Sequence, residues 1–259
     1  MGEEIVRAEG LRKTFTLSRK QQKIEKTGIT RKTAVDGLSF SAYRGQIYGL
    51  LGPNGAGKTT TLRILSTLIR PDAGDAFVCG CSVLKEPQKV RDKIGFMTSE
   101  LKLDGFFTPD YLFRFFGEMH GVDKDTIEKR KTELFSRFGI DKFAQVRVKD
   151  LSTGMKQKIS LVVSIVHDPD VIIFDEPTNG LDVLTAKVVT DFLAELKNMG
   201  KSIILSTHIF SLVEKLCDRV SIIIDGKSVA DGTLEDICAG DTLESKFFEI
   251  YKNVKGDEL

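Results

Sequence analysis

The chain has 259 residues, enough to bury a sizeable hydrophobic core without disulfide or metal support. Its 38 lysines and arginines nearly balance its 37 aspartates and glutamates, so its overall charge argues against nucleic acid as the main partner. The four cysteines form no CxxC pair and fit reduced thiols in a cytosolic protein. No segment approaches the roughly 20 apolar residues that span a bilayer, so work at a membrane would need a separate spanning protein.

Two apolar segments near the N-terminus, Ile5–Leu11 and Leu38–Ala42, are predicted as β-strands. They flank a polar segment, Thr16–Thr33, which holds six basic residues and one acidic residue. We expect this segment to be a solvated hairpin or loop. The alternative is a contact with anionic lipid or with a protein partner.

A glycine-rich motif joins the next predicted strand, Gln46–Leu51, to a predicted helix, Thr59–Leu68. GPNGAGKTT matches the pattern GxxxxGK[ST], whose glycines let backbone N–H groups approach phosphates, while the Lys reaches the outer phosphates and the hydroxyl binds Mg²⁺. The start of the helix adds a positive dipole. The sequence therefore predicts a phosphate-binding loop rather than a structural turn. Its expected nucleotide contacts are Gly52, Pro53, Asn54, Gly55, Ala56, Gly57, Lys58, Thr59 and Thr60.

From Leu101 to about Gly139 the pattern changes to a helical periodicity rich in phenylalanine. This change predicts an inserted helical lobe. We expect most of its aromatic rings, including Phe106 and Phe107, to lie in the core.

Three continuously apolar, β-branched runs follow, as expected for strands covered on both faces. They alternate with two helical stretches, which predicts a parallel α/β sheet. An Asp-Gly pair after the third run predicts a hairpin that ends the sheet in an antiparallel ribbon. The runs are Val171–Phe174, Ser202–Leu205 and Val220–Ile224, the helices Leu184–Met199 and Phe210–Cys217, and the turn Asp225-Gly226.

Two acids and a histidine stand at the ends of these strands. Asp175 closes an apolar strand, where its carboxylate can hold Mg²⁺ through water while the preceding side chains stay buried. Glu176 follows it and is expected to act as the general base that polarises the attacking water. His208 comes just after the next strand and is expected to sense the γ-phosphate and couple it to Glu176. Lys58 completes the expected catalytic set. The alternative interpretation of Asp175 and Glu176 is a pair of exposed acids at a strand end without a catalytic role.

The segment LSTGM, Leu151–Met155, precedes a predicted helix, Met155–Val166. Ser152 and Gly154 at this helix start would offer N–H donors and a dipole to an anion. By itself the segment could equally be an ordinary helix start, with Ser152 as its N-cap.

Taken together, these segments resemble the ATP-binding subunit of ABC transporters over nearly the whole chain. Phosphate loop, LSTGM signature, acid pair, NGLD and histidine occur in the order of that family. The resemblance implies an α/β fold: a P-loop NTPase (ABC ATPase) core with an N-terminal antiparallel β subdomain and an inserted α-helical subdomain at about 100–160. It implies an ATP-binding domain at 1–235 and a short C-terminal extension at 236–259.

The resemblance also implies partners. Two cassettes of this family pack head to tail with two ATP between them, so Ser152 and Gly154 would act on the ATP held by the second copy. Asp182 would communicate across that interface, and Phe15 would stack on adenine. ATP and Mg²⁺ are the expected ligands. The other expected partner is an integral-membrane permease at the cytoplasmic face of the membrane, whose coupling helix would enter a groove lined by a few of the lobe's aromatic residues.

Three details are similar to exporters of the ABC-2 type, above all to the ATPases of NatA-like sodium exporters. They are Ile94–Thr108, the signature STGMKQK and the tail Leu243–Tyr251. The expected function is therefore ATP hydrolysis that powers a separate permease. Sodium ions and drugs are the candidate substrates for export.

The sequence departs from the family at two positions. Most cassettes carry a metal-binding Gln where alignment places Ser99, which would join Thr59 and Asp175 at the metal, directly or through water. Met155 replaces a Gln of the signature.

Two alternatives to a transport ATPase stay open. One is a soluble ABC-class ATPase, which would need a second cassette or a coiled coil, and the other is a nucleotide-dependent regulatory module.

Overall fold

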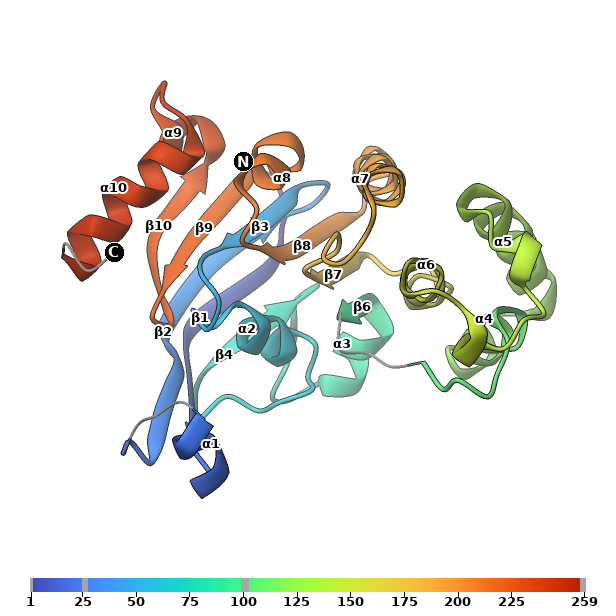
Figure 1. Ribbon diagram of the computed structural model, residues 1–259, viewed down its shortest axis with the longest axis horizontal. Helices are drawn as coiled ribbons and strands as arrows, with labels where there is room; N and C mark the ends of the chain where they lie inside the picture. Colours follow the sequence, from blue (N-terminus) through green and yellow to red (C-terminus); the bar gives the residue numbers. More distant parts are fainter. Residues whose placement is uncertain (1, 25–27, 99–102, 257–259) are drawn as a thin grey trace.

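The computed structural model describes residues 2–24, 28–98 and 103–256 and contains two β-sheets with helices around them (Figure 1). The strands are β1 (Glu4–Thr16), β2 (Arg31–Tyr43), β3 (Ile47–Leu51), β4 (Ala73–Val78), β5 (Cys81–Ser82), β6 (Ile94–Thr98), β7 (Val171–Asp175), β8 (Ser202–Thr207), β9 (Arg219–Ile224) and β10 (Lys227–Thr233). The α-helices are α1 (Arg19–Ile24), α2 (Lys58–Leu65), α3 (Pro87–Lys93), α4 (Pro109–Met119), α5 (Lys124–Phe138), α6 (Thr153–Ser164), α7 (Val183–Asn198), α8 (Phe210–Leu216), α9 (Leu234–Cys238) and α10 (Leu243–Lys255). Short 3-10 turns cover Asp141–Phe143 and Val148–Asp150.

The larger sheet has the strand order β10-β9-β3-β8-β7-β6, and its neighbours are parallel except for β10. The central strands are buried on both faces. Helices such as α7 and α8 cover one face, while α2 together with the antiparallel strands β1, β2 and β4 covers the other. In β7, for example, Ile173 packs into one hydrophobic cluster while Phe174 packs into the other. The predicted parallel α/β sheet is confirmed, and so is the antiparallel ribbon at its edge.

The parallel register brings the carboxyl ends of three strands together. Leu51 of β3 pairs with Thr207 of β8, and Asp175 of β7 pairs with Ser206 of β8. Segments that leave these strands therefore start side by side at one edge of the sheet. The phosphate loop, the acid pair and the histidine all follow at this edge.

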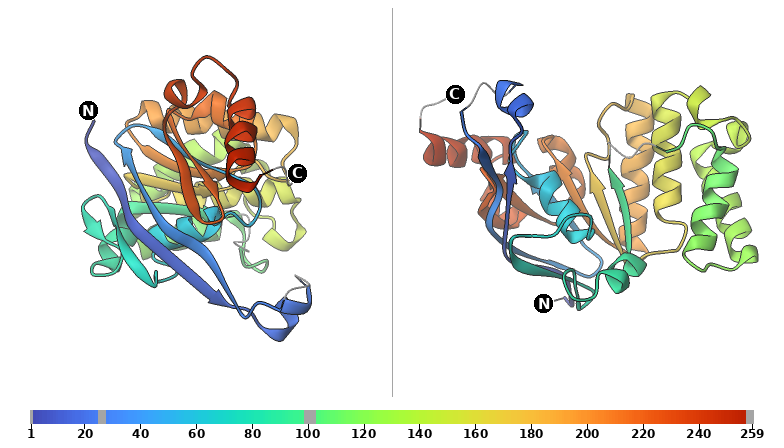
Figure 2. Two further views of the ribbon diagram at one scale, coloured as in Figure 1. Left: turned by 90° about the vertical axis from the view of Figure 1, so that its left-hand side faces the viewer. Right: turned by 90° about the horizontal axis from the view of Figure 1, so that it is seen from below.

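The smaller sheet has the order β2-β1-β4-β5 and is antiparallel. Its β1–β2 hairpin is longer than predicted, because backbone pairing continues out to Thr16 and Arg31, beyond the apolar residues that marked the strands. The polar segment between them was predicted as a hairpin or loop, and its described residues include the short helix α1. Figure 2 shows this hairpin extending away from the rest of the molecule, with α1 at its end.

Helices α4, α5 and α6 lie between β6 and β7 and form a group at the side of the large sheet (Figure 1). Helix α4 begins after the N-cap Thr108 and α5 after Asp123, while Gly139 ends α5 in the left-handed conformation. An inserted helical segment is thus present, while the subdomain and extension boundaries stay a prediction.

The prediction that the aromatic rings of this segment lie mainly in the core holds only in part. Phe113 and Phe138 are buried, but Phe106 is 66% exposed and Phe115 is 43% exposed. Phe106 lies in the turn before α4. Phe115 is exposed because of the helical period, since it shares with Tyr111, four residues earlier on α4, a face that points away from the core.

The C-terminal segment after β10 contains two helices, α9 and α10. Leu243 and Phe247 of α10 are buried against the same hydrophobic cluster as the large sheet. No helix among the described residues combines the length and the apolar character needed to cross a bilayer.

Candidate nucleotide-binding site

The phosphate loop joins β3 to α2, and its shape depends on glycines at points of close backbone contact. Gly57 has φ +105°, and a Cβ there would lie 2.2 Å from the Ala34 carbonyl oxygen. A Cβ on Gly52 would lie 2.2 Å from the Ile223 carbonyl oxygen. Only glycine fits at these two positions, so β2 and β9 fix the path of the loop from behind.

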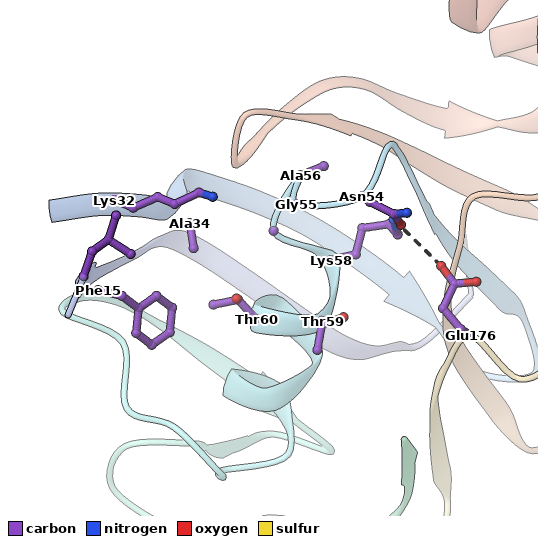
Figure 3. A pocket seen from close by; sticks show the side chains of 12 residues that line it. Phe15, Lys32, Ala34, Asn54, Gly55, Ala56, Lys58, Thr59, Thr60 and Glu176 are labelled. Atoms are coloured by element: carbon purple, nitrogen blue, oxygen red, sulfur yellow. Dashed lines mark ion pairs between the residues drawn. The ribbon is translucent and has the colours of Figure 1, made fainter. Parts of the chain in front are cut away.

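Lys58, the first residue of α2, lies between the loop and the acid pair. Its Nζ donates to the carbonyl oxygens of Gly52 at 2.6 Å and Pro53 at 3.1 Å, and it lies 3.9 Å from Glu176 Oε1 (Figure 3). Burial lowers the pKa of this ammonium, while the carboxylates of Glu176 and Asp175 oppose the shift. The ammonium is therefore placed where the outer phosphates of a nucleotide on this loop would need a positive charge.

Asp175 is buried at the end of β7 and receives two hydroxyl groups on one oxygen. Thr59 Oγ1 donates to Asp175 Oδ1 at 3.1 Å, and Ser206 Oγ donates to the same oxygen at 2.5 Å. The first hydroxyl comes from the phosphate loop and the second from β8. The sequence-predicted metal-binding pair, Thr59 and Asp175, is thus brought together.

Glu176, the expected general base, has an unusual backbone conformation. Its φ is +53°, which is rare for a residue with a side chain, and its N–H donates to the Ser206 carbonyl at 3.1 Å. His208 Nδ1 lies 2.9 Å from Glu176 Oε1. Among the described residues, the buried Oε2 has no hydrogen-bond partner. Because buried carboxylate oxygens normally have partners, Oε2 marks a position suited to a water or a ligand group.

A cavity of about 340 Å³ opens beside these groups. Phe15 forms one wall, 38% exposed, and the phosphate loop forms the opposite side (Figure 3). Leu17, Lys32 and Ala34 from the β1–β2 hairpin complete the lining. An aromatic ring at one end, and a lysine with backbone N–H groups at the other, suit a molecule with a base and a phosphate chain.

The remaining predicted site residues lie elsewhere. Ser152 caps α6 by accepting from Met155 N at 3.3 Å, so the helix starts at Thr153, two residues earlier than predicted. A Cβ on Gly154 would meet nothing within 4 Å, so this backbone is open to contact. Neither residue belongs to the lining of the cavity as far as the described residues show.

Asp182 caps α7, accepting from the N–H groups of Leu184 and Thr185, each at 3.0 Å. The Thr185 hydroxyl adds a third hydrogen bond, and this bond is the main cause of the lowered pKa of Asp182. Asp182 is therefore a charged residue fixed at a helix start outside the cavity. Ser99, the predicted third metal contact, lies outside the described residues.

Sequence reasoning missed the part that Ser206 plays in orienting Asp175. The serine belongs to the motif STH, but nothing in that motif indicates that its hydroxyl donates a hydrogen bond to Asp175 at the end of β7. That partnership follows only from the register in which β7 and β8 pair.

Replacing Ser206 by alanine is expected to lower the ATPase rate constant about tenfold, because Asp175 loses one of the two donors that orient it. Steady-state phosphate release at saturating ATP measures this. The matched control is Ser221→Ala, which removes a buried hydroxyl on β9 that bonds to Ser228 instead. Equal losses in the two variants would mean that Ser206 serves only the packing of the sheet.

The doubly covered parallel sheet, the glycine-constrained loop after its central strand and the adjacent acid pair define a P-loop nucleotide hydrolase. The comparisons with known proteins specify this class further. The family described as ABC transporter matches residues 35–179, more than half of the chain. The chain belongs to the ABC transporter family, as an ATP-binding and ATP-hydrolysing subunit of the exporter type.

Three relatives illustrate this similarity. An uncharacterised ABC transporter ATP-binding protein of Methanocaldococcus jannaschii is 42% identical over 80% of this chain and 74% of its own. The Nod factor export ATP-binding protein I of Ralstonia nicotianae is 36% identical over 98% and 74%. The ABC transporter ATP-binding protein NatA of Bacillus subtilis is 36% identical over 86% and 92%. The expected resemblance to NatA-like exporter ATPases is confirmed.

A solved structure of an ATP-binding subunit of an ABC transporter superposes with a TM-score of 0.84 at 27% identity. The match covers 96% of this chain and all of that one. The predicted fold class, an ABC ATPase fold with an α/β core, is confirmed by this likeness.

Proposed function

We propose that this chain powers a separate membrane permease of an ABC-2 type exporter and does so as a head-to-tail dimer with two ATP at the interface. The observation that carries the proposal is the separation of the site into two parts within one chain. Lys58 and Glu176 line the cavity, and His208 contacts Glu176. Ser152 and Gly154 start a helix outside this lining. A second copy facing the cavity with its own signature would complete the set of phosphate contacts.

The start of α7 supports the second copy as partner. Val183 is 84% exposed and Leu184 is 77% exposed, directly after Asp182. Exposed apolar side chains beside a fixed carboxylate are the composition expected of an interface between protein subunits. Asp182 is thereby proposed to lie at the dimer interface, in keeping with the sequence expectation.

The residues present fit a magnesium ion. Mg²⁺ prefers oxygen ligands, and the Thr59 hydroxyl and the Asp175 carboxylate provide two of them within hydrogen-bond distance of each other. When bound, the ion would neutralise negative charge on the β- and γ-phosphates. In our proposal Thr59 and Asp175 hold it, with Asp175 oriented by Ser206.

The hydrolytic step is assigned to Glu176. One carboxylate oxygen is held by His208 Nδ1, and the other is buried without a hydrogen-bond partner among the described residues. We propose that the second oxygen accepts a proton from the water that attacks the γ-phosphate. Lys58 compensates the charge on the outer phosphates, and Phe15 stacks on the adenine ring.

A row of aromatic rings on α4 and in the turn before it is the proposed docking site for a helix of the permease. Phe107 and Tyr111 stack with ring centroids 4.5 Å apart, and Tyr111 and Phe115 with centroids 6.0 Å apart. Tyr111 is 46% exposed. An apolar row along a helix, with charged residues around it, suits an amphipathic helix from a partner. Docking there would hold the chain peripherally at the cytoplasmic face of a membrane.

The test is co-expression with a candidate ABC-2 type permease, sought among the neighbouring reading frames, followed by solubilisation in detergent and purification through a tag on that permease. The wild-type chain should co-purify, and Tyr111→Glu should reduce its recovery at least tenfold, because a charge enters the apolar row. Met199→Glu is the control, since Met199 is 69% exposed at the end of α7, away from the row. Equal recovery of Tyr111→Glu and wild type would contradict the docking site.

The proposed direction of transport is export, which is supported by the name of the Nod factor export relative and by the ABC-2 resemblance. Sodium and drugs are the candidate cargoes from the sequence resemblance. The choice of cargo is assigned to the permease, because the described residues contain no helix that could line a path through a membrane.

A further inference from the structure

The turn between β9 and β10 packs directly behind the phosphate loop. Gly226 N donates to the Ala56 carbonyl at 2.9 Å, and the Gly226 carbonyl accepts from Asp36 N at 2.9 Å. The turn is therefore hydrogen-bonded to the loop on one side and to β2 on the other. Because Ala56 lines the nucleotide cavity, the turn contacts the cavity wall from its outer side.

The contact is made by backbone atoms that leave no space for a side chain. A Cβ on Gly226 would lie 2.8 Å from the Ala34 carbonyl oxygen and 3.0 Å from Val35 Cα. A Cβ on Gly57 would lie 3.4 Å from Gly226 Cα. Three chain segments thus meet at van der Waals distance, and a shift of the turn would move the backbone that binds phosphate.

Helix α10 holds this turn at its exposed side. Lys255 Nζ, near the end of the helix, lies 2.5 Å from Asp225 Oδ2, the residue before Gly226. Figures 1 and 2 show α10 lying alongside the β9–β10 ribbon. The ion pair joins the C-terminal end of the helix to the turn that supports the loop.

The other end of α10 packs on α8. The Phe247 and Phe210 rings have centroids 5.1 Å apart, and Leu243 N donates to Glu214 Oε1 at 3.0 Å. Phe210 is the first residue of α8 and follows His208 by two positions. One helix therefore contacts both the support of the phosphate loop and the helix that begins after His208.

We propose that the β9–β10 turn and α10 are positioning elements that set the affinity of this chain for ATP. Gly226 supports the backbone of Ala56 and Gly57, and Lys255 fixes the turn through Asp225. The proposal rests on the ATP site at Lys58. Since an exposed ion pair contributes little free energy, the larger effect belongs to Gly226 and the smaller one to Lys255.

Gly226→Ala is the first test, measured by titrating the full chain with a fluorescent ATP analogue. We expect the dissociation constant to rise about tenfold or more, while kcat at saturating ATP changes less than about twofold. The reason is that, among the described residues, no hydrogen bond or ion pair joins Asp225 or Gly226 to Glu176. Gly200→Ala is the matched control. Gly200 has φ +84°, close to the +78° of Gly226, but a Cβ there meets nothing within 4 Å. It therefore imposes the same backbone strain without the contact.

The exposed ion pair gives a second test that leaves the core intact. Lys255→Glu should raise the dissociation constant about threefold, and Asp225→Lys combined with Lys255→Glu should restore it. The proposal is overturned if Gly226→Ala binds like Gly200→Ala, or if the charge swap fails to restore affinity. A wild-type chain that binds no better than Lys58→Ala would instead overturn the ATP site itself. If Gly226→Ala does not fold, the proposal is tested by whether the double variant Asp225→Lys/Lys255→Glu restores the affinity that Lys255→Glu loses.

Discussion

Replacement of Lys58 by alanine is expected to weaken ATP binding at least 100-fold and to abolish measurable hydrolysis. The ammonium is buried between the phosphate loop and two carboxylates, and nothing else at this end of the cavity lining carries a positive charge among the described residues. Charge-assisted hydrogen bonds contribute about 1.5–3 kcal/mol each, so losing the contacts to two phosphates accounts for such a change. Titration with a fluorescent ATP analogue and phosphate release at saturating ATP measure the two effects.

Lys32→Ala is the control for the loss of one positive charge from the cavity, because Lys32 lines the same cavity from β2. It should weaken binding only a few-fold, since its exposed charge is screened by solvent. Thermal unfolding without nucleotide should be recorded for both variants, because Lys58 also donates to the carbonyls of Gly52 and Pro53. Wild-type turnover in Lys58→Ala would contradict the assignment of the phosphate loop.

The elements that carry chemistry could be predicted from the sequence because each is encoded locally. The glycines and Lys58 of the phosphate loop stand within nine residues, and the strand before Asp175 is continuously apolar. Both patterns constrain the backbone within one or two elements. The parallel sheet followed from the alternation of such strands with helices, and the register then placed Asp175 beside Ser206.

Other features depend on contacts between distant segments and leave no local pattern. Strands β1 and β2 extend into polar residues because they pair with each other, not because they are apolar. The close contact of Gly226 with Ala34 joins positions almost 200 residues apart. The Asp-Gly pair predicted the turn correctly, but nothing in it indicates that the turn supports the phosphate loop.

Replacement of Glu176 by glutamine should separate ATP binding from hydrolysis. The amide keeps the size of the side chain but cannot accept the proton of the attacking water, so turnover should fall about 10²- to 10⁴-fold. Lys58 and the loop are unchanged, so affinity for ATP should stay within a few-fold of wild type. The substitution also removes the negative charge 3.9 Å from Lys58 Nζ. The ammonium of Lys58 then interacts with the phosphates without competition from this carboxylate.

If the signature of a second copy completes the site, this variant should also accumulate as a dimer when ATP and Mg²⁺ are saturating. Size-exclusion chromatography with light scattering measures the mass directly. The double variant Lys58→Ala/Glu176→Gln is the control and should stay monomeric, because it cannot retain the nucleotide that joins the two copies. A Glu176→Gln chain that binds ATP but remains monomeric would refute the head-to-tail arrangement. Wild-type hydrolysis in the same variant would refute Glu176 as the base, so one protein tests the two assignments independently.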